Sequence, residues 1–63
     1  MQVIVKDGSK VNVSEGASIL GVAATISSGL ARNAIAGKLN GHLCQLATPV
    51  HEGDLVEIVT LND

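Results

Sequence analysis

The chain has 63 residues, of which 46% are hydrophobic and none is aromatic, and four Lys and Arg against six Asp and Glu give it a formal net charge of −2. This length allows one domain, residues 1–63, with a modest core, because so short a chain buries only about 60% of the surface that it exposes when unfolded. The scattered cations and the missing aromatic rings argue against a free-standing nucleic-acid-binding protein, which needs clustered positive charge and stacking platforms.

The first two predicted elements are short strands that form a hairpin. Residues 2–6 are extended in character, Asp7-Gly8-Ser9 supplies a turn, and apolar and polar residues alternate over residues 10–13. If the valines of both strands face the core, Ile4 points to the opposite side of the sheet.

One helix is predicted over residues 18–27. Ser18 can accept a hydrogen bond from a free backbone amide in the first turn. Gly29 is expected to end the helix in the left-handed conformation. Apolar residues recur at helical spacing and form one inward stripe, which consists of Ile19, Val22, Ala23, Ile26 and, one turn further on, Leu30.

The second half of the chain predicts three more strands. Residues 34–39 and 42–46 flank Asn40-Gly41, which favours a two-residue hairpin turn because both of its residues tolerate positive φ. A run rich in β-branched residues follows Gly53-Asp54 and predicts a last strand over residues 55–60. This strand is expected beside the first one, because so apolar a run is a liability at a sheet edge.

The order ββαβββ indicates an α+β fold, with a mixed sheet and one helix packed on one of its faces. Alternation then places the neighbours of Val56 and Ile58 on the uncovered face of the sheet. Aliphatic residues rimmed by charges there would form a partner surface, and scattered exposed aliphatic residues are the alternative. The candidate partner-binding residues are Ile4, Lys6, Lys38, Leu55, Glu57 and Val59, joined by Ala36.

The cations Lys6, Lys10, Arg32 and Lys38 are the only candidates for contacts with RNA phosphates. Ordinary solvating charge is the alternative reading of all four. No apolar run reaches the roughly 20 residues of a membrane span, and the sequence lacks the layout of a signal peptide, so no membrane partner and a cytoplasmic location are expected.

No catalytic and no metal-binding residue is predicted. His42 and Cys44 alternate on one strand, but two side chains are too few for a zinc site, so a solvated His and a packed Cys are expected. His51 lies beside Glu52 with few groups that would tune its pKa as a general base. The glycines do not form a phosphate-cradling run before a helix, and no cofactor is predicted for this domain.

Four motifs spread over nearly the whole chain carry a family resemblance: Asp7-Gly8-Ser9, Asn40-Gly41-His42-Leu43, Thr48-Pro49-Val50 and residues 53–60. Together they resemble the TGS domain, a β-grasp or ubiquitin-like fold of threonyl-tRNA synthetases, certain GTPases and ppGpp enzymes. Residues 29–32 and 34–41 are most similar to the version at the N-terminus of bacterial threonyl-tRNA synthetases.

The resemblance implies a non-catalytic accessory module that serves the ligation of threonine to tRNA by domain docking, regulation or weak RNA contact. Such a chain is a fragment of a larger protein, whose other domains are its partners and would use ATP, Mg and Zn. The isolated domain is expected to be monomeric, and tRNA is a partner only in the full-length context.

The resemblance leaves two other hosts or roles open. A regulatory module of a ppGpp synthetase/hydrolase or of a GTPase is the alternative host. A sulfur carrier of the same fold would need a C-terminal Gly-Gly, whereas this sequence ends in Leu61-Asn62-Asp63.

Overall fold

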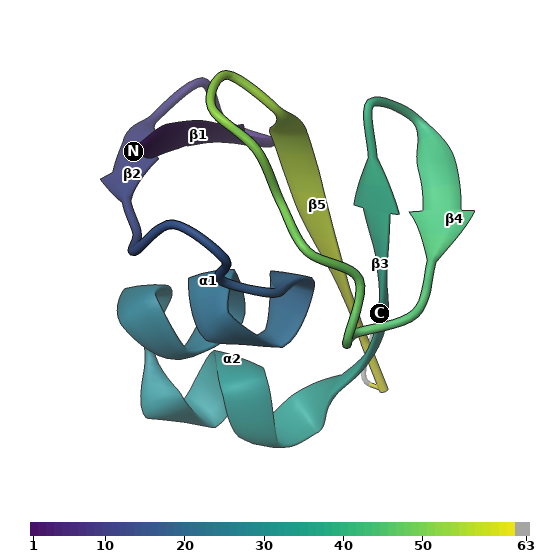
Figure 1. The fold of residues 1–63 in the computed structure, drawn as a ribbon. Coiled ribbons are helices and arrows are strands. Elements are labelled where there is room, and N and C mark those ends of the chain that lie inside the picture. Colours follow the sequence, from purple (N-terminus) through teal and green to yellow (C-terminus); the bar gives the residue numbers. More distant parts are fainter. Residues whose placement is uncertain (62–63) are drawn as a thin grey trace.

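The computed structural model describes residues 1–61. Within them it forms one five-stranded sheet, in the order β2-β1-β5-β3-β4, and two helices that cover one side of it (Figure 1). The α+β β-grasp fold predicted from the sequence is therefore confirmed. The elements in chain order are β1 (Gln2–Val5), β2 (Lys10–Asn12), α1 (Ile19–Ile26), α2 (Ser28–Asn33), β3 (Ala34–Leu39), β4 (His42–Cys44) and β5 (Leu55–Thr60).

The last strand lies beside the first one, as predicted, and occupies the centre of the sheet. β5 runs parallel to β1, with Ile4 opposite Leu55, and antiparallel to β3 on its other side. The two edge strands, β2 and β4, have only three residues each, which limits the unpaired backbone that the sheet exposes. Asn62 and Asp63, which stand where a sulfur carrier would have its Gly-Gly, lie outside the described residues.

The core forms where the inward sheet face meets α1. Side chains of β1, β2, β3 and β5 that point to the helices pack against it, including Val5, Val11, Leu39 and Ile58. As expected, Ile4 points away from this cluster. The buried residues of the cluster are Val3, Val13, Ile19, Val22, Val50 and Val56.

The predicted single helix is wrong, because two short helices replace it. Ser18 caps α1 as expected, with its Oγ accepting from the backbone N–H of Gly21 at 3.2 Å. Ser27 then breaks the helix with extended backbone, at φ −165° and ψ 150°, and its Oγ accepts from the backbone N–H of Leu30 at 2.9 Å to start α2. Gly29 lies inside α2, without the positive φ predicted for it.

The break also changes the predicted inward stripe. Ile26 is 43% exposed at the end of α1, and Leu30 belongs to the next helix. The helical spacing continued across the break, but the serine cap redirects the chain there.

The turns agree with the predictions from the sequence more closely than the strand ends do. Asn40 has φ 53° and Gly41 has φ 88°, as a two-residue type I′ turn requires. β1, β2 and β4 each stop one or two residues before the predicted ends, at Val5, Asn12 and Cys44. No helix in residues 1–61 has the length and apolar character needed to cross a membrane.

Candidate docking surface

The strand register gathers the predicted partner residues on the side of the sheet that faces away from the helices. Ile4 lies opposite Lys10 on β2 and opposite Leu55 on β5. One step along the sheet, Lys38 of β3 lies opposite Glu57. We call this surface the outer sheet face, and its residues are Ile4, Lys6, Lys10, Ala36, Lys38, Leu43, Leu55, Glu57 and Val59.

Two leucines dominate the apolar part of the outer sheet face. Leu55 is 45% exposed and Leu43 is 70% exposed, whereas Ile4 and Val59 are half-buried between their neighbours. Leu43 is not among the partner-binding residues predicted from the sequence, although the sequence carries a signal for it. A two-residue turn at Asn40-Gly41 fixes the register that places Leu43 opposite Lys38.

The charges of the outer sheet face are mostly positive, although the whole chain is negative. Lys6 Nζ lies 3.7 Å from Glu57 Oε2, an exposed pair that contributes little to stability. Neither Lys10 nor Lys38 lies within 4.0 Å of a carboxylate of residues 1–61. The face therefore presents three lysines with Glu57 as its one acidic residue.

The four cations considered for RNA contact are not brought together. Lys6, Lys10 and Lys38 share the outer sheet face, but Arg32 lies in the last turn of α2, on the helical side of the sheet. The chain has no aromatic side chain that would stack on a base beside these lysines. The outer sheet face thus gathers three of the four cations, and their contact with RNA phosphates stays a prediction.

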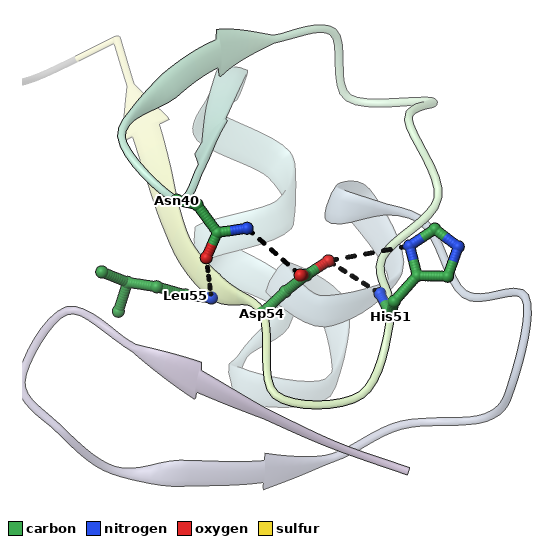
Figure 2. A network of polar contacts seen from close by, with 4 residues as sticks. All are labelled: Asn40, His51, Asp54 and Leu55. Carbon is green, nitrogen blue, oxygen red and sulfur yellow. Dashed lines mark hydrogen bonds and ion pairs between the residues drawn. The ribbon is translucent and has the colours of Figure 1, made fainter.

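A polar network fixes the start of β5 against the β3–β4 turn (Figure 2). Asn40 Oδ1 accepts from the backbone N–H of Leu55 at 3.0 Å, and Asn40 Nδ2 donates to Asp54 Oδ1 at 3.2 Å. The other carboxylate oxygen of Asp54 accepts from the backbone N–H of His51 at 2.8 Å. The network therefore fixes the backbone of Leu55, the first residue of β5, whose side chain lies on the outer sheet face.

The two histidines and the cysteine lie apart from any cluster of ligands. His51 Nδ1 is 3.8 Å from Asp54 Oδ2, and the His51 side chain is 81% exposed. Cys44 packs against the core and its thiol donates to the carbonyl of exposed His42 at 3.4 Å. Among residues 1–61, no three His, Cys, Asp or Glu side chains gather as a metal site would require.

The pKa of the Asp7 carboxyl group, in the β1–β2 turn, is lowered. The backbone N–H of Ser9 donates to Asp7 Oδ1 at 2.8 Å and holds the pKa of Asp7 below its ordinary value of 3.8. This bond stabilises the turn that the Asp7-Gly8-Ser9 motif predicted.

Comparison with known proteins identifies relatives that are much longer than this chain. It is 50% identical to the threonine-tRNA ligase of Geobacter sp. (strain M21) over 60 residues, which are 95% of this chain and 9% of that protein. It is 43% identical to the threonine-tRNA ligase of Desulforamulus reducens over 63 residues, which are 100% of this chain and 10% of that protein. It is 47% identical to the threonine-tRNA ligase of Listeria welshimeri over 58 residues, which are 92% of this chain and 9% of that protein.

The chain thus spans about a tenth of the length of the curated relatives that it matches. The family model of the TGS domain matches residues 1–60. This match covers nearly every described residue, and it confirms the resemblance carried by the turn and strand motifs. The chain belongs to the TGS domain family.

Proposed function

We propose that this chain is the non-catalytic N-terminal TGS module of a threonine-tRNA ligase. Its relatives are named threonine-tRNA ligases, and the chain matches about a tenth of their length. The ATP, Mg and Zn used in joining threonine to tRNA would then act in other domains. As part of protein synthesis, the module would work in the cytoplasm.

The module would act by docking its outer sheet face against another domain of the same protein. The observation that carries this proposal is the exposure of Leu55, beside Ile4, and of Leu43, across Lys38, on the sheet face opposite to the two helices. Exposed aliphatic side chains set among charges are typical of surfaces that meet a partner.

The energies favour a partner in the same chain. Covering the exposed parts of Leu43 and Leu55 would contribute about 2–3 kcal/mol, since full burial of a leucine side chain contributes about 1.5–3 kcal/mol. Separate molecules need about 8 kcal/mol for a Kd of 1 μM. Linked domains need only about 4 kcal/mol, because a linker holds them at about millimolar effective concentration, and the other residues of the outer sheet face would supply roughly the remaining 1–2 kcal/mol.

The coding sequence that continues past residue 63 tests the host. Editing and class II synthetase motifs there would support a threonine-tRNA ligase. Nucleotidyl-transferase or GTPase motifs would instead assign the module to one of the other TGS hosts and contradict the proposal.

Leu55→Asp tests the docking surface in the intact protein that carries the module. A docked module tumbles with the whole protein, so its amide resonances are broad, and Leu55→Asp should release it and sharpen them. Leu20→Asp is the matched control, because Leu20 is 41% exposed on α1, away from the sheet. Narrow amide lines in the unmodified protein, or unchanged lines in Leu55→Asp, would refute docking through this face.

A further inference from the structure

A second surface lies on the helical side of β5, where β1 stops. A hollow of about 260 Å³ there has apolar walls formed by β1, β5 and both helices, among them Val5, Ile26, Leu30 and Ile58. Ile26 is 43% exposed beside it, although it is a large aliphatic residue at the end of α1. The hollow lies on the side of the sheet opposite to Ile4 and Leu55, because Val5 and Ile58 point toward the helices; only Lys6 and Glu57 border both surfaces.

The backbone beside the hollow is an open strand edge. Along a strand, the N–H and C=O groups of successive residues point to opposite edges. The carbonyl of Leu55 accepts from the backbone N–H of Asn40 on the β3 side, at 2.8 Å. The carbonyl of Asp54 accepts from the backbone N–H of Ile4 on the β1 side, also at 2.8 Å. The backbone N–H and C=O groups of the odd-numbered residues of β5 therefore point toward β3, and those of the even-numbered residues point toward β1.

β1 ends too early to pair with the second half of β5. The parallel pairing stops at Val5 opposite Val56. Within residues 1–61, no strand and no backbone hydrogen bond from another segment covers the edge that Ile58 and Thr60 present on this side. Their N–H and C=O groups are thus free to pair with an additional strand.

The rim of the hollow is charged, with an excess of carboxylate. Lys6, Asp7 and Glu57 lie along it. The single ammonium group of Lys6 is 3.7 Å from Glu57, and the Asp7 carboxylate accepts a bond only from the local turn among the described residues. This balance complements a basic side chain on whatever occupies the hollow.

We propose that the hollow and the free edge of β5 bind an extended peptide segment of a partner protein as an added strand. Its backbone pairs with Ile58 and Thr60, and its alternate aliphatic side chains fill the space against Ile26 and Leu30. A flanking Lys or Arg of the peptide meets Asp7. This binding goes beyond docking through the outer sheet face and does not depend on it.

Other ligand classes fit this surface less well. The hollow is smaller than the roughly 300–1,000 Å³ of sites for drug-sized ligands, and no polar or charged residue of the described chain is buried to orient one. Nucleic acid would place phosphates beside the carboxylates of Asp7 and Glu57, with no aromatic ring for its bases.

The test uses the peptide acetyl-Lys-Val-Thr-Val-Lys-amide, which presents a basic end to Asp7 in either strand direction. Amide hydrogen exchange of the 63-residue chain is followed while this peptide is added up to millimolar concentration. Without peptide, the amides of Ile58 and Thr60 should exchange faster than those of Glu57 and Val59, which face β3. With peptide, Ile58 and Thr60 should gain at least about tenfold saturable protection.

Two altered peptides separate strand pairing from simple apolar contact. The same peptide with methylated nitrogens at its three central residues keeps every side chain but cannot pair as a strand, and it should give no protection. Replacing both of its lysines by glutamate should weaken binding, because two carboxylates line the rim.

Matched variants of the chain locate the site. Ile26→Asp places a charge in the hollow and should weaken peptide binding at least about tenfold. Leu20→Asp and Leu55→Asp change residues of similar exposure elsewhere and should leave binding within about twofold. Thermal melts confirm that each variant is folded.

Any one of four results would overturn the proposal. The first three are no protection of Ile58 and Thr60 at millimolar peptide, equal binding of the methylated peptide, and equal loss in Leu20→Asp. Protection by a single-stranded oligonucleotide in place of the peptide would assign the edge to another ligand class and would overturn it too. None of these results bears on docking through Leu55, so the two proposals fail separately.

Discussion

We predict that Gly37→Ala destabilises the domain, because α1 crosses β3 at this residue without room for a Cβ atom. A Cβ atom on Gly37 would overlap Ile19 Cγ2 and would lie 3.0 Å from Ile19 Cδ1 and 3.2 Å from the Glu57 carbonyl oxygen. Ile19 is fully buried, at 0% exposure, so its side chain cannot move aside without displacing other core residues. Forcing an extra methyl group into such a core costs about 1–3 kcal/mol.

That cost is large for a domain of this size. At about 0.05–0.15 kcal/mol per residue, the whole domain is stable by about 3–9 kcal/mol. A loss of about 1–3 kcal/mol should lower Tm by about 5–20 °C. Thermal and urea unfolding followed by far-UV circular dichroism measure both quantities.

The same substitution at two helical glycines is the control. At Gly21 the nearest atom to an added Cβ is Ala17 Cβ at 3.6 Å, and at Gly29 it is Ser27 Oγ at 3.9 Å. Both are ordinary contacts, so alanine there should raise stability by up to about 1 kcal/mol through helix propensity. Alanine should therefore lower the free energy of unfolding at Gly37 in β3 and raise it at Gly21 and Gly29 in the helices.

A double-mutant cycle with Ile19→Ala assigns the cost to this one contact. Ile19→Ala alone should destabilise by about 2–5 kcal/mol because it leaves a cavity. In that background, the Cβ of Gly37→Ala enters the cavity, so its cost should fall to near zero or reverse. An equal cost of Gly37→Ala in both backgrounds would refute the packing argument.

Three further predictions concern the caps, the hairpin turn and the Asp7 carboxylate. Ser18→Ala should lower the free energy of unfolding, measured in urea, by about 0.5–2 kcal/mol. Ser27→Ala should lower it less, because α1 carries core residues whereas α2 has no buried residue. Equal losses in the two variants would contradict this. Asn40→Ala should cost about 1–2 kcal/mol more than Asn40→Gly, because both lose the side-chain bonds but only glycine tolerates φ 53° freely. The folded-state pKa of Asp7 lies below 3.8, so its stabilisation is present above that pH and is lost as pH falls through the lowered value. Asp7→Asn should therefore flatten the dependence of stability on pH below about pH 4, and an unchanged pH profile would refute this role.

The sheet was predictable because its signals are local and regular. The Asn40-Gly41 turn sets the register of β3 and β4, and the alternation of apolar and polar residues over residues 10–13 orients the first hairpin and so places Ile4 on the outer side. The positions of Ile4 and Leu55 on the outer sheet face followed from these two rules. Their role in binding a partner stays a prediction.

The second helix was not predicted because the same residues signal an end and a start. Ser27 and Gly29 follow an apolar helical stripe, a pattern typical of termination. The structure instead uses the Ser27 side chain to cap the next helix. Only the packing of α2 on α1 decides between the two readings.

The polar network and the hollow depend on contacts between distant parts of the chain. Asn40 and Asp54 are 14 residues apart, and neither residue indicates the other in the sequence. The hollow exists because β1 stops at Val5 while β5 continues to Thr60. Strand ends are set by tertiary packing, so local patterns did not locate this edge.

Methyl resonances report directly on docking through the outer sheet face, because the chain is rich in Ile, Leu and Val. The spectra to compare are those of the isolated 63-residue chain and of the intact protein that carries it. Docking through the outer sheet face predicts that the methyl groups of Ile4, Leu43 and Leu55 shift, while those of buried Val22 stay in place. Unshifted methyl groups on the outer sheet face of the intact protein would contradict docking through this face.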